Sequence, residues 1–311
     1  MRVAIVGGTG FIGGYLVDEL LRAGHQPVVL VRPGSGAKVR QPDRCVLVPG
    51  DVSSAENLTT LLDGCDAVIY NVGILREFPR QGITFENTHY NGLVATLDAA
   101  QARGVSRLLL MSANGATRPG TPYQETKKRA EDHARESGMD VTIFRPSVVF
   151  GDPRGTNEIA SQLYNDVIRL PLPAIAFYPG SFPSEKRIRM SPVHVEDLAA
   201  AFVNALPDRS TFEKIYELGG AETLTWREML ERVAAAVDRK KWILPMPVSL
   251  MWCAALLFDR LPFFPVTRDQ LTMLAESNVA GANHLRKLIG RRPRSMEAAE
   301  LQYLRRRVAN A

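Results

Sequence analysis

The sequence predicts an α/β protein with a doubly wound parallel sheet and a smaller C-terminal lobe. Through the first half, short apolar runs alternate with stretches in which apolar residues recur at helical spacing. This order is typical of parallel strands joined by right-handed helical crossovers. With 311 residues, the chain also exceeds the usual size of a single domain. We therefore expect one large α/β domain and a second, smaller one.

The chain starts with a predicted strand, a glycine-rich turn and a helix. Residues 2–6 are mostly apolar and rich in β-branched side chains, as expected of a strand buried on both faces. Glycines at 7, 10 and 13 allow a tight turn, close approach of a pyrophosphate and close packing of the next helix, whose N–H groups attract phosphate. A glycine-rich turn without a ligand is the alternative. The expected Rossmann-type cofactor site begins with Gly7, Thr9, Gly10, Phe11, Ile12 and Gly13.

The end of the second strand, predicted over 27–31, bears on which nucleotide binds. An Asp or Glu there usually binds the ribose of NAD(H), whereas an Arg accommodates the 2′-phosphate of NADP(H). Here Arg32 follows the strand, and no acid stands beside it. Because a guanidinium matches the geometry of a phosphate, we expect NADP(H) to be preferred over NAD(H). The alternative is that Arg32 is only a solvated loop residue.

Three further strands are predicted at 44–48, 67–70 and 107–111, with helices around 58–62 and over 85–104. Ligands of open parallel sheets bind at the carboxyl ends of the strands. The residues that follow these three strands, and that we expect at the site, are Asp51, Val52, Asn71, Val72, Gly73 and Ser112. For Asp51 two roles stay open, since it either contacts the adenine or caps the next helix.

A capped helix is predicted from Pro122 onward, with Thr121 as its N-cap and Gln124 completing a capping box. Tyr123 and Lys127 lie four residues apart on one face of this helix. An unperturbed tyrosine is a poor base at neutral pH, but a nearby ammonium and a helix N-terminus both favour its phenolate. Tyr123 is therefore a candidate general acid/base.

Taken together, these motifs resemble those of the extended short-chain dehydrogenase/reductases. The motifs are the GxxGxxG turn from Gly7 to Gly13, Asp51-Val52, Asn71-Val72-Gly73, Ser112, the YxxxK sequence from Tyr123 to Lys127, and the segment from Arg145 to Gly151. With the segments 191–199 and 216–220, the chain is most similar to the atypical branch that includes the nucleotide-binding accessory subunit of respiratory complex I and its bacterial relatives. The resemblance covers nearly the whole chain.

The resemblance implies a role for each site residue. Tyr123 exchanges a proton with the substrate, and Ser112 polarises the substrate oxygen. Lys127 lowers the pKa of the tyrosine and holds the nicotinamide ribose of the cofactor. Pro146 and Val149 contribute a wall of the nicotinamide pocket.

Two features keep a second interpretation open. Ser112 precedes Tyr123 by only eleven residues, and His89 stands where many relatives carry a structural Asn. In this interpretation, Tyr123 and Lys127 bind the cofactor without catalysing a reaction. Arg145 likewise either borders the nicotinamide pocket or is a structural charge at the end of a strand.

The domain boundaries follow from the change of pattern after Gly151. We expect residues 1–150 to form the NAD(P)-binding domain, with 190–206 returning to it. The smaller substrate or partner lobe is expected over 151–189 and 207–311.

His194 lies before a helix predicted over 198–206, with Glu196 or Asp197 as its cap. We expect His194 to be a packed, hydrogen-bonded residue rather than a catalytic one. The five histidines and three cysteines of the chain show no metal-binding spacing, so no metal site is expected.

The expected lobe contains one basic and two apolar segments. Arg187 and Arg189 either bind an anionic substrate or lipid headgroup or are solvated loop charges. Residues 248–258 and 261–266 either close the core of the lobe or face a greasy substrate, a membrane surface or a partner protein.

The composition is that of an ordinary globular protein, with 45% hydrophobic and 23% charged residues and a net charge of +5. This charge suits a phosphate-bearing cofactor, and we expect no nucleic acid as partner. Scattered cysteines fit a reducing compartment. No signal peptide is expected, because the first residues form the cofactor strand, and the apolar stretch 242–258 is interrupted by Pro245 and Pro247. We expect a cytoplasmic protein, either free or peripheral to the inner membrane.

Three functions stay open. The first is an NADP(H)-dependent oxidoreductase that transfers hydride to or from a carbonyl or alcohol of an apolar, quinone- or lipid-related substrate. The second is a non-catalytic NADP(H)-binding module that stabilises or helps to assemble a respiratory or quinone-synthesis membrane complex. The third is a nucleotide-sugar epimerase or dehydratase, for which Arg32 is atypical because those relatives usually hold NAD. Fold alone does not separate the three.

Overall fold

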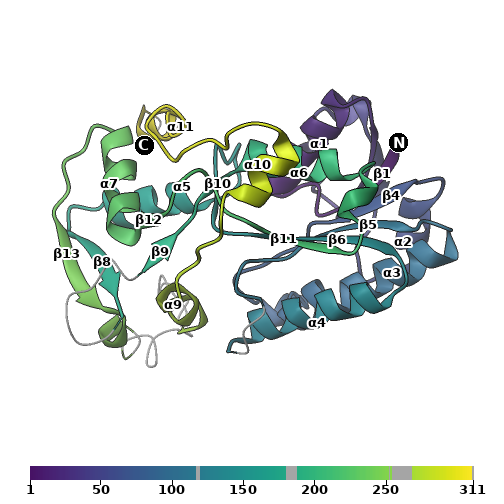
Figure 1. Cartoon of the computed structure of the whole chain (residues 1–311), viewed down its shortest axis with the longest axis horizontal. Helices are drawn as coiled ribbons and strands as arrows, with labels where there is room; N and C mark the ends of the chain where they lie inside the picture. Colours follow the sequence, from purple (N-terminus) through teal and green to yellow (C-terminus); the bar gives the residue numbers. More distant parts are fainter. Residues whose placement is uncertain (117–119, 180–187, 252, 254–267, 310–311) are drawn as a thin grey trace. The chain divides into compact units, whose positions relative to one another are not determined.

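The computed structural model describes residues 1–116, 120–179, 188–251, 253 and 268–309, drawn in colour in Figure 1. The chain divides into two compact units. The first comprises Met1–Arg145 and Leu198–Tyr216, and the second comprises Pro146–Asp197 and Glu217–Ala311. Arg187 and most of the apolar segments 248–258 and 261–266 lie outside the described residues. Which unit binds a cofactor and which binds a substrate or partner stays a prediction.

A seven-stranded sheet with the order β11-β6-β5-β4-β1-β2-β3 forms the centre of the first unit. Its strands are β1 (Arg2–Val6), β2 (Gln26–Val31), β3 (Val46–Pro49), β4 (Ala67–Tyr70), β5 (Arg107–Met111), β6 (Asp140–Pro146) and β11 (Lys214–Leu218). β1 pairs in parallel with both β2 and β4, so that Val3 lies opposite Pro27 on one side and Ala67 on the other. The connection order reverses beside β1, which is where such sheets bind ligands. The predicted doubly wound, Rossmann-type sheet is confirmed.

Helices cover both faces of this sheet (Figure 1). They are α1 (Phe11–Arg22), α2 (Ala55–Leu62), α3 (Gly92–Ala102), α4 (Pro122–Glu136) and α6 (Val195–Ala205), with short 3-10 turns at Gly36–Lys38, Pro42–Arg44, Pro79–Gln81 and Arg209–Thr211. On one face, Leu58 of α2, Leu97 of α3 and Ala130 of α4 share a core with Leu108 of β5. Burial of these apolar side chains fixes the helices on the sheet.

The predicted helix over 85–104 is in fact two elements. A π-helix over Glu86–Asn91 precedes α3. The cause is Tyr70 of β4, whose buried hydroxyl donates a 2.7 Å hydrogen bond to the carbonyl oxygen of Thr88. The same hydroxyl would lie 2.5 Å from a Cβ at Gly92, so only glycine fits there. A side chain inserted into the helical ladder commonly widens it locally.

The second unit contains short strand pairs and helices around its own core. The strands are β7 (Val149–Phe150), β8 (Ala174–Tyr178), β9 (Arg189–Met190), β10 (Val193–His194), β12 (Leu224–Thr225) and β13 (Ile243–Pro247). The helices are α5 (Ile159–Leu163), a π-helix over Tyr164–Ile168, α7 (Trp226–Ala236), α9 (Arg268–Ala275), α10 (Asn283–Ile289) and α11 (Tyr303–Ala309). Met229, Leu230 and Val233 bury one face of α7 in the core of the unit. Within the ranges described, every helix is too short or too polar to cross a membrane.

His194 is packed, as predicted, but the expected helix caps are wrong. α6 begins at Val195, so Glu196 and Asp197 lie inside its first turn rather than before it. The buried carboxylate of Asp197 accepts a hydrogen bond from the backbone N–H of Arg294 at 2.6 Å and pairs with Arg291 at 2.5 Å. Asp197 is therefore paired inside the helix and does not serve as its N-cap. Burial and the charge of Arg294 lower the pKa of His194, which favours its neutral form.

Candidate functional site

The glycine-rich turn is tight because backbone atoms lie where side chains at Gly7 and Gly13 would have to fit. Gly7 has a φ of +93°, and a Cβ there would lie 2.5 Å from the carbonyl oxygen of Asn71. A Cβ at Gly13 would overlap the Gly7 carbonyl oxygen and lie 2.7 Å from the carbonyl carbon of Gly8. A Cβ at Gly10, by contrast, would have the Gly7 carbonyl oxygen at 3.6 Å and, apart from its neighbours in the chain, no other atom of the described residues within 4 Å. The space in front of Gly10 is therefore open.

The first turn of α1 has the properties of a phosphate site. Its N-cap, Gly10, has no side chain to cap the helix, and the first turn carries no acid. The N–H of Gly14 donates to the carbonyl oxygen of Gly10 at 3.0 Å, so the N–H groups of Phe11, Ile12 and Gly13 precede the first intrahelical bond. Thr9 lies half-buried in the same turn. These donors, together with the helix dipole, fit the pyrophosphate of a dinucleotide.

Two arginines lie near this turn, and the sequence pattern indicated only one of them. Arg32 directly follows β2 and is exposed, and its carbonyl oxygen accepts a 2.9 Å hydrogen bond from the N–H of Ser35. Arg40 lies beside α1, since its Cγ would be 3.4 Å from a Cβ at Gly14, and its Nε is 3.9 Å from a carboxylate oxygen of Asp18. The only sequence signal for Arg40 was the number of basic residues in the loop after β2.

Asp51 does not cap α2, so that alternative is wrong. The N-cap is Ser54, whose hydroxyl accepts the N–H of Asn57 at 3.3 Å. A carboxylate oxygen of Asp51 instead accepts the backbone N–H of Ser53 at 3.0 Å and its hydroxyl at 2.8 Å. Val52 packs partly buried against the core. A contact of Asp51 and Val52 with the adenine stays a prediction.

Lys127 holds together the carboxyl ends of two neighbouring strands. Its buried ammonium donates to the carbonyl oxygens of Val72, after β4, and Met111, at the end of β5, at 3.0 and 3.1 Å. A Cβ at Gly73 would lie 3.7 Å from the same nitrogen. Asn71 reaches the glycine turn, since its side-chain amide donates to the carbonyl oxygen of Gly7 at 3.4 Å. Burial lowers the pKa of Lys127 to about 8.

Tyr123 stands near the start of α4 in an aromatic cluster. Thr121 caps the helix through the N–H of Gln124, as predicted. The ring of Tyr123 meets those of His89 and Phe85 edge-on, with centroids 5.2 and 5.8 Å apart. Burial raises the pKa of Tyr123 to about 12, so the predicted lowering of this pKa by Lys127 is wrong for this structure.

The physical reason lies in the surroundings of both groups. The ammonium of Lys127 is hydrogen-bonded to carbonyl oxygens, and the half-buried ring of Tyr123 packs against His89 and Phe85. Desolvation disfavours a phenolate. Tyr123 is therefore protonated at neutral pH and can act as a proton donor.

His89 is a neutral, fully hydrogen-bonded member of the same cluster. It is 1% exposed, and its Nε2 accepts the N–H of Ile74 at 3.2 Å. Its Nδ1 lies 3.2 Å from the hydroxyl of Thr126 on α4. Burial and the charge of Lys127 lower the pKa of His89 to about 2. The residue thereby ties the π-helix to α4 and to the end of β4.

Ser112, at the end of β5, is buried and already has a partner for its hydroxyl proton. The hydroxyl donates to the carboxylate of Glu131, which is 1% exposed. Arg145 binds the same carboxylate through Nη2 and through Nε, the latter at 2.9 Å. In this Ser112–Glu131–Arg145 network the guanidinium of Arg145 is paired with a buried carboxylate, as expected of a structural charge at the end of a strand.

Glu131 was not predicted from the sequence. The available signal was its spacing, because it follows Lys127 by four residues and therefore continues the helical face that carries Tyr123 and Lys127. Its partner Ser112 directly follows β5, and its partner Arg145 lies in β6. Only the folded sheet brings them together.

Two predicted cofactor contacts belong to the second unit. Pro146 is the last residue of β6 and is buried, and Val149 lies in β7, where it pairs with Val193 of β10. Their contact with a nicotinamide stays a prediction. Among the residues that the structure describes, no group of three or more His, Cys, Asp or Glu is placed to hold a metal ion.

Comparison with known families and proteins adds independent findings. The family described as NAD(P)H-binding matches residues 7–167. The chain is 28% identical to the ceramide reductase of Caulobacter vibrioides, with 83% of this chain and 77% of that protein covered. It is 29% identical to the divinyl chlorophyllide a 8-vinyl-reductase of Oryza sativa subsp. indica, with 86% and 66% covered.

A third relative is the 40 kDa subunit of NADH-ubiquinone oxidoreductase from Neurospora crassa, which is 24% identical with 84% and 67% covered. Among solved structures, gox2253 aligns with a TM-score of 0.78 at 20% identity over 99% of this chain and 98% of that one. The UDP-glucose 4-epimerase of Thermus thermophilus in complex with NAD aligns with a TM-score of 0.75 at 23% identity over 99% and 100%. At these identities the two structures support the fold alone.

Proposed function

Because this chain belongs to the NAD(P)H-binding family, in the atypical branch of the short-chain dehydrogenase/reductases, we propose that it is an NADP(H)-dependent reductase. The reaction would transfer hydride between the nicotinamide and a carbonyl or alcohol carbon of an apolar substrate. The observation that carries the proposal is the position of Lys127. Its ammonium lies at the ends of β4 and β5, four residues after a protonated Tyr123 on α4 and at the edge of the sheet where ligands bind.

Bound NADPH supplies the hydride, and the residues of the chain bind, orient and supply the proton. The N–H groups at the start of α1 bind the pyrophosphate, and Arg32 and Arg40 provide positive charge for the 2′-phosphate. Lys127 holds the ribose next to Asn71 and Gly73. Tyr123 holds a proton on its phenol oxygen and passes it to the substrate oxygen as hydride reaches the carbon. Because burial raises its pKa, the phenol is protonated at neutral pH, which is the form that reduction needs.

The names of the relatives suggest a class of substrate. Relatives include a ceramide reductase and subunits named for ubiquinone reduction. We infer a lipid- or quinone-related substrate, handled by a cytoplasmic protein that works at the periphery of a membrane.

One observation favours a second function, a non-catalytic NADP(H)-binding module of a membrane complex. The hydroxyl proton of Ser112 is directed at Glu131, so it is not presented to a substrate oxygen. Relatives named as subunits of NADH-ubiquinone oxidoreductase and of NADH dehydrogenase fit this function. The epimerase alternative has less support, because the likeness to solved epimerases extends to the fold alone.

Absorbance at about 340 nm tests the proposal directly, because only reduced nicotinamide absorbs there. The purified protein is loaded with NADPH and mixed with a panel of long-chain ketones and soluble quinones. We expect oxidation by at least one compound in the wild type and in a control, Tyr90→Phe. In Tyr123→Phe, oxidation should be about 100-fold slower or more, with NADPH affinity unchanged. Retention of NADPH without oxidation by any compound supports the non-catalytic module. Equal rates in Tyr123→Phe and the wild type contradict the role of Tyr123.

A further inference from the structure

Exposed large hydrophobic side chains are concentrated in one part of the second unit. Among the described residues, nine such side chains are exposed, and five of them lie in two segments, 170–172 and 242–250. The five are Leu170, Leu172, Trp242, Leu244 and Leu250. Trp242 is 81% exposed and Leu172 is 65% exposed. Single exposed apolar residues are ordinary, but a cluster that includes a nearly bare tryptophan indicates an interaction surface.

The two segments lie side by side because hydrogen bonds join them. The N–H of Ala174 donates to the carbonyl oxygen of Trp242 at 2.7 Å. From there β8 and β13 pair in parallel, with Ile175 opposite Leu244. Lys241 donates to the carbonyl oxygens of Ile168, at 3.2 Å, and of Leu170. The backbones that carry Leu170, Leu172, Trp242 and Leu244 therefore lie next to one another.

Basic groups gather on the same segments. We call the whole set the Trp242 surface, which comprises Arg169, Leu170, Leu172, Arg239, Lys240, Lys241, Trp242 and Leu244. The Nη1 of Arg239 donates to the carbonyl oxygen of Arg169 at 3.1 Å, which brings two guanidinium-bearing residues next to each other. Arg169, Arg239 and Lys240 are exposed.

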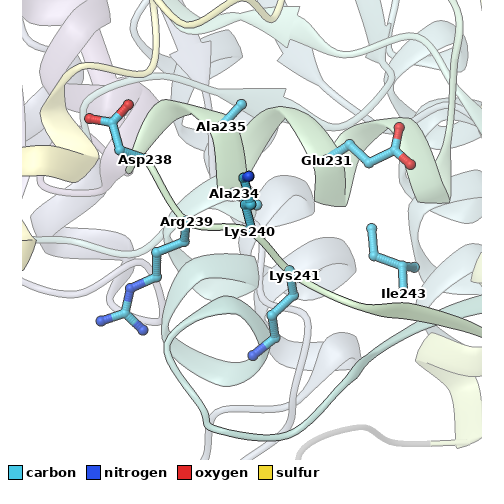
Figure 2. Close-up of a pocket in the computed structure, with 8 residues that line it drawn as sticks. All are labelled: Glu231, Ala234, Ala235, Asp238, Arg239, Lys240, Lys241 and Ile243. Carbon is cyan, nitrogen blue, oxygen red and sulfur yellow. The ribbon is translucent and has the colours of Figure 1, made fainter.

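Figure 2 shows how the charges are arranged around the hollow after α7, which has a volume of ≈ 570 Å³. The side chains of Arg239 and Lys241 extend together to one side of the chain segment, whereas the carboxylates of Glu231 and Asp238 lie on the other (Figure 2). Asp238 is paired with Arg305 at 3.0 Å. Burial and, less strongly, the charge of Arg239 lower the pKa of Lys241. An anionic partner would oppose the repulsion between these two positive charges.

The backbone of this surface is unsuited to pairing with another protein strand. Within the described ranges β13 pairs with β8 alone, so its other edge meets no described strand. Pro245 and Pro247 lie in β13, and proline has no N–H to donate to an added strand. A fluid lipid surface needs no such hydrogen bonds and accepts exposed Trp and Leu together with Lys and Arg.

We propose that the Trp242 surface docks the protein onto an anionic lipid bilayer. Trp242 and Leu172 enter the headgroup region, and Arg169, Arg239 and Lys240 face the lipid phosphates. This inference uses the second unit alone and does not depend on the cofactor chemistry of the first.

Co-sedimentation of the full chain with vesicles tests the proposal. One set of vesicles is phosphatidylcholine, and the other contains in addition about one third phosphatidylglycerol. We expect binding to the anionic vesicles that is lost at high salt, and Lys240→Glu should weaken it by about fivefold or more. Arg135→Glu, which reverses an exposed charge on α4, is the control for charge and should bind as the wild type does.

A second pair of variants tests the apolar part. Trp242→Ser should weaken binding, whereas Leu75→Ser, at a residue 54% exposed in the first unit, should not. Circular dichroism checks that all four variants fold. Equal binding to both kinds of vesicle, no binding to either, or wild-type binding by Trp242→Ser would overturn the proposal. Sedimentation velocity without lipid measures whether the protein forms a dimer. A dimer that Trp242→Ser dissociates would also overturn the proposal, because the surface would then be an interface between two copies of the chain.

Discussion

The hydroxyl of Ser112 donates its hydrogen bond to the carboxylate of Glu131. Arg145 binds that carboxylate from β6, so a strand-end serine, a helix carboxylate and a strand-end guanidinium form one buried network. While Glu131 is ionised, Ser112 keeps lone pairs to accept a hydrogen bond but has no proton left to donate. The phenol of Tyr123 is then the donor at hand for a substrate oxygen. The first two predictions follow from this arrangement.

Replacing Glu131 should destabilise the fold strongly. Glu131→Gln removes the carboxylate charge that the buried guanidinium of Arg145 binds, and breaking a buried pair costs about 3–5 kcal/mol. Arg129→Gln is the matched control, because its pair with Glu86 is exposed and should contribute less than about 1 kcal/mol. Urea unfolding measures both. A loss below about 1 kcal/mol in Glu131→Gln would show that the network does little for stability.

Replacing Ser112 should have a small effect on the proposed reduction. Because its hydroxyl proton is directed at Glu131, we expect Ser112→Ala to lower kcat/KM for NADPH oxidation by less than about tenfold. A serine that stabilised the substrate oxygen would be expected to cost about 100-fold or more. Steady-state kinetics of the folded variant distinguish these two expectations. A loss of about 100-fold or more in kcat/KM would support the role of Ser112 that the family resemblance implies.

His89 should make the protein less stable in acid. Its pKa is about 2 in the folded chain and about 6.5 when unfolded, so below pH 6.5 the unfolded chain binds a proton that the folded chain does not. As the pH decreases below 6.5, this residue therefore lowers the free energy of unfolding by about 1.4 kcal/mol per pH unit. His89→Asn lacks this contribution.

Denaturant unfolding at several pH values measures the difference between wild type and His89→Asn. We expect this difference to shift by about 2 kcal/mol in favour of the variant between about pH 6.5 and about pH 5. Parallel pH dependence of the two proteins would mean that His89 accepts a proton in the folded state.

Gly10 and Gly13 of the turn should respond differently to a methyl group. Gly13→Ala must shift the turn, because its Cβ overlaps the Gly7 carbonyl oxygen, and we expect lower stability and no detectable NADPH binding. Gly10→Ala meets only one atom, at 3.6 Å, so its stability should stay within about 1 kcal/mol of the wild type. Its NADPH affinity should still fall about tenfold or more, because the methyl group fills the space in front of α1.

Calorimetric titration and thermal unfolding of Gly10→Ala and Gly13→Ala check this contrast. If Gly10→Ala bound NADPH as tightly as the wild type, the pyrophosphate would not lie in front of α1.

Much of the first unit was predictable from the sequence because its strands are nearly continuous apolar runs. Residues 67–70 and 107–111 are strands with the predicted bounds. Thr121 and Pro122 marked the start of α4 because capping depends on neighbours in the chain. The division at Glu86–Asn91 could not be predicted, since it depends on the hydroxyl of Tyr70 from another element.

The sequence predicted which residues lie in the candidate site, but it could not predict their pKa values. The positions of Tyr123 and Lys127 follow from helical spacing, whereas their pKa values depend on what surrounds them after folding. Phe85 and His89 desolvate Tyr123, and carbonyl oxygens from two strand ends bind Lys127. Glu131 has no short motif of its own, and its role is visible only where β5 and β6 end beside α4.

The central claim is that the chain prefers NADP(H) to NAD(H), and a single kind of measurement tests it directly. Isothermal titration compares the affinities of NADPH and NADH for the wild type, for Arg32→Asp and for the charge control Arg135→Asp. We expect the wild type and the control to bind NADPH about tenfold or more tightly than NADH, and Arg32→Asp to lose this preference. Equal or tighter binding of NADH by the wild type would contradict the account.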